Sequence, residues 1–232
     1  MDNQVIAVQD KIIMRLNFLV IMADMKQYLQ PTEFFDFHKS KVKNKAFDIT
    51  DGLKNDEEKA KALFYWVRDQ IKYRQGSFYL TKSTFKASTN LRRGYGFCVS
   101  KAVLLSTLAR AVKIPARIHL CDIINHKIPQ KVIDYMGTEI FYIHGYSELF
   151  LGGKWLKLTP AFDKQTSIKG NYVLVEFDGV HDALFPSHDD EGNPFVEYLE
   201  DRGSFSDVPF EEIKRVIIDK YKPMLEKAFD RI

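Results

Sequence analysis

The stretch GYGFCVSKAVLLSTLARAVKIPAR, residues 94–117, decides the fold. A turn with two glycines leads into an apolar run, which predicts one helix from Cys98 to about Val112. Five residues at helical spacing form its apolar face: Cys98, Ala102, Leu105, Ala109 and Val112. Pro115 ends the helix, because proline disfavours the helical conformation of the residue before it. A cysteine is therefore expected at the first position of a helix.

That position favours a reactive thiol. The unpaired N–H groups and the positive dipole end of a helix N-terminus stabilise the thiolate, which is the nucleophilic form. The alternative is a buried structural cysteine, since free cysteine is among the most buried residue types. The only other cysteine, Cys121, ends a predicted strand and is expected to be structural. A redox thiol protein would need a resolving cysteine, and the sequence has no Cys-x-x-Cys motif.

Helices are predicted before this stretch and strands after it. Residues 10–29 have helical spacing, and a second helix spans residues 56–73 with Asp56 as its N-cap. Strands are predicted at residues 116–121, 139–151, 154–159 and 172–178. Residues 179–206 are expected to form a packed surface loop, and a closing helix begins near Val208. Helices followed by strands predict an α+β fold.

A hairpin brings a histidine and a hydroxyl together. Gly152-Gly153 predicts a two-residue turn between the second and third strands. Glu148 then faces Lys157, a favourable cross-strand pair that supports this register. In the same register His144 and Thr159 are diagonal neighbours on one face of the sheet. Among the six histidines, His144 is therefore the best candidate for the base that a cysteine nucleophile needs.

Over about residues 51–163 the chain resembles the transglutaminase-like superfamily. The stretches that carry the resemblance are residues 60–73, 94–105 and 108–117, His144-Gly145-Tyr146-Ser147-Glu148 and Gly153-Lys154-Trp155. Phe177-Asp178-Gly179 and Asp207-Val208-Pro209-Phe210 are similar to a bacterial subgroup of small members, a looser match. The resemblance implies a papain-like core, in which N-terminal helices and the nucleophile helix pack on an antiparallel sheet. It also implies a Cys-His-Asp triad in which Cys98 and His144 are the first two members.

The third member of the triad is open. Where the family usually has an aspartate after the hairpin tryptophan, this chain has Thr159. A threonine hydroxyl can orient an imidazole but brings no charge to stabilise imidazolium. We therefore expect Asp163 to curl back to His144, with Thr159 as the alternative.

The resemblance implies cysteine-dependent acyl transfer on peptide or side-chain amides through a thioester, with a protein or peptide substrate. Water as acceptor would make the protein a hydrolase or deamidase, and an amine would make it a transglutaminase-type enzyme. The alternative is a catalytically silent peptide-binding module that uses the same cleft. Asp122, Asn125 and His126 follow the first predicted strand, in a segment expected either to line this cleft or to form a solvated turn.

The domain organisation, the charge distribution and the absence of membrane and metal motifs exclude several other classes of protein. No linker or repeat divides the chain, so we expect one domain over residues 1–232: a helical extension (1–50), the catalytic core (51–178) and a C-terminal loop and helix (179–232). The 34 basic and 31 acidic residues are interspersed, which argues against a nucleic-acid partner. Residues 12–23 are too short an apolar run to span a membrane, and a cytoplasmic protein is expected. No cofactor is expected and no metal, because His181-Asp182 and His188-Asp189 match no metal-ligand spacing.

Overall fold

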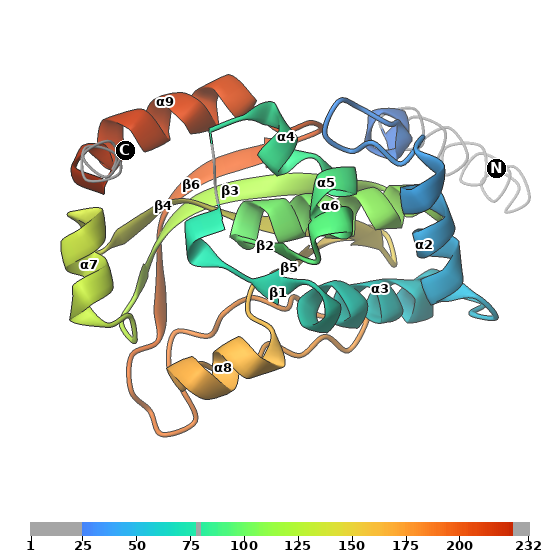
Figure 1. Ribbon diagram of the computed structural model, residues 1–232. Helices are drawn as coiled ribbons and strands as arrows, with labels where there is room; N and C mark the ends of the chain where they lie inside the picture. Colours follow the sequence, from blue (N-terminus) through green and yellow to red (C-terminus); the bar gives the residue numbers. More distant parts are fainter. Residues whose placement is uncertain (1–24, 78–79, 225–232) are drawn as a thin grey trace, which may run out of the picture.

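A four-stranded antiparallel sheet with helices packed against it forms the centre of the molecule (Figure 1). The computed structural model describes residues 25–77 and 80–224. The strand order is β5-β4-β3-β6, where the strands span Ala116–Asn125 (β3), Ile140–Leu151 (β4), Lys154–Leu158 (β5) and Val196–Phe205 (β6). The predicted α+β class, with the nucleophile helix on an antiparallel sheet, is confirmed.

The helix predicted from Cys98 is α6, Cys98–Ala111, and it is the most enclosed element of the fold. It packs between β3 and β4 on one side and three helices on the other: α2 (Ser40–Thr50), α3 (Asp56–Gln70) and α5 (Ala87–Arg93). Every residue from Val99 to Ala111 is buried, so the helix is covered all round and not only on its apolar face. The buried side chain of Lys101 is hydrogen-bonded to the backbone, since its Nζ donates to the carbonyls of Arg68 and Ile71. These two bonds fix the end of α3 against the first turn of α6.

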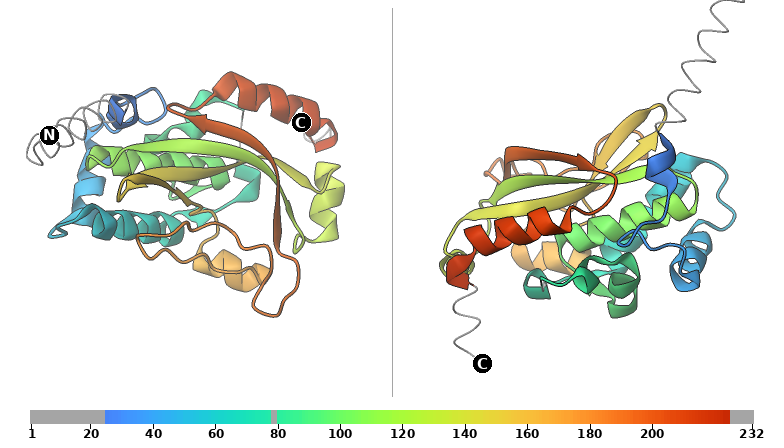
Figure 2. Two further views of the ribbon diagram at one scale, coloured as in Figure 1. Left: turned by 180° about the vertical axis from the view of Figure 1, so that it is seen from behind. Right: turned by 90° about the horizontal axis from the view of Figure 1, so that it is seen from above.

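Smaller elements complete the chain. They are η1 (Lys26–Leu29), η2 (Gln75–Ser77), α4 (Lys82–Phe85), α7 (Gln130–Met136), α8 (Lys164–Gly170), α9 (Phe210–Lys220) and the parallel pair β1 (Lys72–Tyr73) and β2 (Tyr95–Gly96). Figure 2 shows α6 and α9 on the same side of the sheet. Within the described ranges, no helix has both the length and the apolar character needed to cross a bilayer.

The hairpin register is confirmed. Glu148 lies opposite Lys157 and Phe150 opposite Trp155, with Gly152 and Gly153 at the turn. Both glycines have positive φ, the conformation that a tight hairpin turn requires. The pairing stops at Leu158, so Thr159 is the first residue beyond the strand.

Helix boundaries differ from the prediction at both ends of α3 and before α2. Asn55, and not Asp56, is the N-cap of α3, because its Oδ1 accepts from the backbone N–H of Glu58 at 2.8 Å. The same helix ends at Gln70, and Tyr73 belongs to β1. Of the helix predicted over 10–29, residues 10–24 lie outside the described part of the chain, as does the apolar run 12–23, and residues 26–29 are a short 3₁₀ helix.

Two predictions for the C-terminal third are wrong. Residues 172–178 form no strand, because they lie along α3 and bond to its side chains: Nη1 of Arg68 donates to the carbonyl of Val175, and the Tyr65 hydroxyl bonds both backbone groups of Phe177. The segment 179–206 is not only a loop, since it contains β6 at the edge of the sheet. Only the first residue of β6 is buried, so the strand lacks the alternation that identifies strands in a sequence.

Candidate active site

Cys98 is the first residue of α6, and its thiol faces the neighbouring strand. Cys98 is half-buried as a residue, while Val99 behind it is fully buried. Burial raises the pKa of the Cys98 thiol, and hydrogen bonds from the backbone N–H groups of Gly145, Val99 and Cys98 itself partly offset this effect. A Cβ at Gly145 would lie 2.9 Å from Cα of Val99, so a glycine is needed here for β4 to approach the start of α6.

His144 lies on β4, directly before that glycine. Its side chain is buried, its Nε2 is 3.5 Å from Oγ1 of Thr159, and its ring lies 5.6 Å from the ring of Phe185. The predicted pairing of His144 with Thr159 on one face is therefore present in the structure. Among the described residues no hydrogen bond joins the Cys98 sulfur to the imidazole, but both side chains line one cavity. Such contacts are often long before a substrate binds.

Burial also decides the charge of the pair. Desolvation lowers the pKa of His144 to about 3, and it raises the pKa of Cys98. A thiolate–imidazolium pair is therefore disfavoured, and these pKa directions favour a neutral thiol beside a neutral imidazole. The hydroxyl of Thr159 supplies no charge that would reverse this preference.

Asp163 does not orient His144, which corrects the preferred assignment. Its carboxylate is the N-cap of α8 and accepts from the backbone N–H of Thr166 at 3.0 Å and from the Thr166 hydroxyl at 3.0 Å. It also accepts from the backbone N–H of Tyr73 at 2.7 Å. The carboxylate thus caps α8 and binds the backbone of β1. The chain continues into α8 after Asp163 and does not turn back toward His144 as the sequence suggested. The hydroxyl of Thr159, and not the Asp163 carboxylate, lies next to Nε2 of His144.

Of the three residues expected to line the cleft, the structure places only Asn125 there. Its side chain is buried, and Oδ1 accepts from the backbone N–H of Lys127. His126 lies at an exposed edge, 3.6 Å from the carboxylate of Glu197. The strand β3 continues to Asn125, and the turn follows it at His126 and Lys127, so the alternative of a solvated turn holds for His126 but not for Asp122.

Asp122 is buried inside the sheet and is paired with Arg202 of β6. The guanidinium donates Nε to Oδ1 at 2.7 Å and Nη2 to Oδ2 at 2.6 Å. Oδ1 also accepts from the backbone N–H of Ile143 at 2.9 Å. Both β4 and β6 insert an extra residue opposite Asp122, so the carboxylate fills an irregular point of the sheet next to His144.

The cavity that holds Cys98 and His144 has a volume of about 570 Å³ and is mostly apolar. It is lined by residues of α7, α9, β4 and the segment after β5, including Val132, Met136, Phe141, Phe162, Phe185, Ile213, Ile217 and Met224. Sequence reasoning missed these residues. The spacing of Ile213 and Ile217 indicates a buried face of α9, but nothing in the sequence shows that this face meets the nucleophile.

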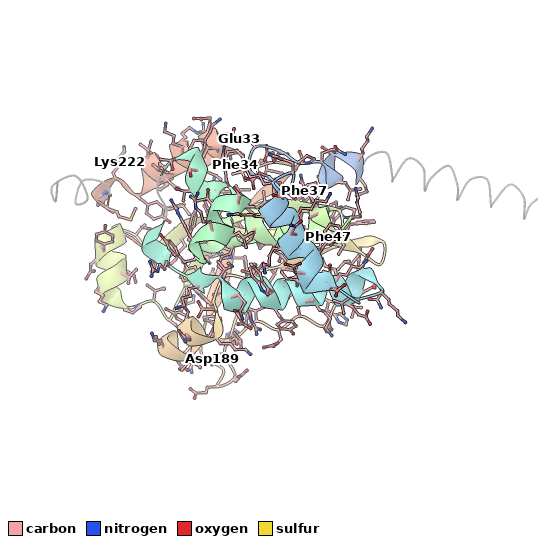
Figure 3. All side chains as sticks on the ribbon, turned by 45° about the vertical axis from the view of Figure 1, so that its right-hand side comes forward. Glu33, Phe34, Phe37, Phe47, Asp189 and Lys222 are labelled. Atoms are coloured by element: carbon pink, nitrogen blue, oxygen red, sulfur yellow. The ribbon has the colours of Figure 1, made fainter. Side chains whose placement is uncertain are left out.

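Outside the cavity, His181 and Asp189 each contact another charged side chain. His181 bonds Asp178 three residues before it, and Nζ of Lys127 lies 2.7 Å from Oδ2 of Asp189. Asp189 lies beside α8 at the rim of the molecule (Figure 3). In the described part of the chain, no group of three or more histidine, cysteine, aspartate or glutamate residues could hold a metal ion.

Comparison with known proteins places the chain in a family. A family model described as "Transglutaminase-like superfamily" matches residues 43–160, which include Cys98, His144 and Thr159. No curated protein matches the sequence.

Two crystal structures are similar to parts of the chain. One is described as a "putative cysteine protease" from Cytophaga hutchinsonii, with 19% identity and a TM-score of 0.48 over 78% of this chain and 53% of that one. The other is described as a "putative protease" from Parabacteroides distasonis, with 19% identity and a TM-score of 0.37 over 51% of this chain and 22% of that one. The chain thus spans about half the length of the first protein and less than a quarter of the second.

Proposed function

The chain belongs to the transglutaminase-like superfamily, and on that premise we propose that it catalyses cysteine-dependent acyl transfer on peptide or side-chain amides. One observation carries the proposal: Cys98, at the start of a buried helix, and His144, on the adjacent strand, line the same cavity. A thiol, a base and a space for the substrate are the parts that nucleophilic catalysis needs.

The first half-reaction forms a thioester. The Cys98 sulfur attacks the amide carbonyl while its proton moves to Nδ1 of His144, because Nε2 faces Thr159. The C–N bond then breaks, and the proton on Nδ1 passes to the departing amine. His144 begins this step neutral, so it acts as a general base toward a thiol and not as the partner of a preformed thiolate.

The second half-reaction releases the acyl group. A water molecule or a second amine attacks the thioester and gives its proton to Nδ1. The C–S bond breaks, the sulfur takes the proton back, and the product is a carboxylic acid or a new amide. Hydrolysis requires a water molecule beside His144, and the apolar lining of the cavity limits the access of water to that position.

We propose two donors for the oxyanion of the tetrahedral intermediates. The backbone N–H of Cys98 lies at a helix N-terminus, where N–H groups have no partner within the helix. The side-chain amide of Gln75 lines the same cavity, and its Nε2 is 3.5 Å from the sulfur of Met136. A thioether is a weak acceptor, so this amide can turn to an oxyanion at little cost.

Turnover of a panel of peptide amides tests the proposal, with ammonia or amine release as the readout. Cys98→Ala is expected to abolish turnover while the circular dichroism spectrum stays unchanged. Cys121→Ala is the matched control, since Cys121 is a buried thiol whose pKa burial also raises but which does not line the cavity. Equal turnover by wild type and Cys98→Ala would contradict the proposal.

A second candidate function is a catalytically silent module that binds a peptide in the same cavity. The observation that favours it is the neutral pair, in which Thr159 stands where an aspartate would charge the imidazole. Saturable peptide binding that Cys98→Ala leaves unchanged, together with no turnover by the wild type, would support this function.

A further inference from the structure

We propose that the substrate presents a bulky apolar group next to the scissile amide and that this group occupies the cavity beside Cys98. The inference rests on the proposed function and specifies its substrate class. Most of the side chains around the cavity are aliphatic or aromatic, and its volume of about 570 Å³ lies in the range of small-molecule binding sites. A polar side chain placed there would lose its hydration without gaining partners.

Part of the cavity wall lies beyond the part of the chain that matches the family. The match ends at residue 160, whereas Phe162, Tyr172, Phe185 and the α9 residues Ile213 and Ile217 follow it. The nucleophile therefore lies in the matched core, and the C-terminal third of the chain adds further apolar residues to the wall of the same cavity. Both parts of the chain thus present apolar side chains to the substrate space beside Cys98.

The cavity opens to solvent beside α7. Lys131 and Tyr135 line it and are exposed, while Val132 between them is half-buried and Met136 is fully buried. An apolar group can thus enter past the exposed side chains and be covered farther in. The few polar groups in the lining include the Asn125 and Gln75 amides, which suit the hydrogen-bonding end of an amide.

The first experiment measures binding without using the reactivity of Cys98. The full chain is labelled with ¹³C at its methionine methyl groups and titrated with hexanamide or, as the polar control, acetamide. Met136 and Met224 line the cavity, whereas Met25 does not, so hexanamide is expected to shift the first two resonances saturably and to leave Met25 unchanged. Hexanamide is expected to bind at least about tenfold more tightly than acetamide, because its methylene groups leave water.

Two variants of α7 provide the matched comparison. Val132→Asp places a carboxylate in the wall and is expected to weaken hexanamide binding at least about tenfold. Ile133→Asp changes a half-buried neighbour that does not line the cavity and is expected to bind hexanamide as the wild type does. Equal affinity for hexanamide and acetamide, or no effect of Val132→Asp, would overturn the inference.

A second experiment separates this inference from the proposed function. The rates of Cys98 alkylation by N-hexyliodoacetamide and by iodoacetamide are compared, and a ratio of at least about ten is expected in the wild type and near one in Val132→Asp. Rapid labelling of Cys98 by both reagents at equal rates would contradict the apolar substrate class, but it would still support Cys98 as a nucleophile. Hexanamide binding with no labelling of Cys98 by either reagent would support the apolar ligand and contradict the acyl-transfer function.

Discussion

The carboxylate of Asp122 holds the backbone of Ile143, the residue directly before His144. Oδ1 of Asp122 accepts from the Ile143 N–H at 2.9 Å, and Ile143 has φ of 61°, in the left-handed region. That conformation is costly for a β-branched residue and persists only where the surroundings enforce it. Asp122, fixed in turn by Arg202, is therefore a positioning residue that sets the direction of the histidine side chain.

Removing that acceptor should misplace His144. Asp122→Ala is expected to lower kcat about tenfold or more while KM changes little, because the base moves and the cavity wall does not. Asp122→Asn keeps an oxygen acceptor for the Ile143 N–H and should restore most of the rate. Asp201→Ala is the control, because it removes an exposed carboxylate from β6, the strand that carries Arg202, the partner of Asp122. Equal losses of rate in the alanine and asparagine variants would show a purely structural effect.

Thr159→Asp should convert the neutral pair into a charged one. A carboxylate beside Nε2 raises the pKa of His144, because an opposite charge nearby favours the protonated imidazole, and the imidazolium in turn lowers the pKa of Cys98. Iodoacetamide labelling of Cys98 in the wild type is expected to rise only at alkaline pH, since burial raises the thiol's pKa. In Thr159→Asp the midpoint should fall by about one pH unit or more.

Thr159→Asn is the matched control for this change, as it offers a similar shape without the charge. Its labelling midpoint should stay at the wild-type value. Identical profiles for the aspartate and asparagine variants would mean that position 159 does not control the charge of His144.

Gln75→Leu should slow the acyl-transfer step if the Gln75 amide stabilises the oxyanion. Loss of one such donor typically costs about 10²–10³ in kcat, with little effect on substrate binding. Gln75→Asn, whose shorter side chain keeps the amide, should lose less. An unchanged kcat in Gln75→Leu would exclude Gln75 as a donor.

Acid stability should depend on Glu148, which is buried on β4. Desolvation opposes its charge, but hydrogen bonds with His119, Ser204 and Arg117 are together stronger and lower its pKa from 4.5 to about 2. A carboxylate with a lowered folded-state pKa stabilises the fold above its unfolded value, and this contribution disappears as the pH falls from about 4.5 to 2.

Chemical denaturation between pH 2 and 7 measures this contribution. The free energy of unfolding of the wild type should fall by up to about 3 kcal/mol through the acid range on account of this group, and Glu148→Gln should show a flatter profile and a lower plateau. Glu197→Gln, at an exposed position on β6, should follow the wild type. A Glu148→Gln profile parallel to that of the wild type would contradict the assignment.

The sequence is informative where a local pattern determines the structure. The Gly-rich turn and the apolar run specify α6, and the Gly152-Gly153 turn with the Glu148–Lys157 pair specifies the register that brings His144 to Thr159. Both relationships depend on neighbours along the chain or across one turn.

What the sequence does not show depends on contacts between distant segments. Asp163 has the residue type that the triad needs, but its carboxylate is taken by Thr166 and by Tyr73, ninety positions earlier. The strand β6 carries no alternation, because it lies at an edge and only its first residue is buried. The charge of His144 depends on burial by side chains such as Phe185, which no spacing rule connects to it.

The most direct test of the central claim is to trap the acyl-enzyme. The full chain is mixed with 4-nitrophenyl hexanoate, quenched in acid within seconds and analysed by intact-protein mass spectrometry followed by peptide mapping. The account predicts one hexanoyl group on Cys98 that neutral hydroxylamine removes, formed more slowly in His144→Ala and absent from Cys98→Ala. An adduct that survives in Cys98→Ala, or a wild-type protein that never acquires one, would contradict it.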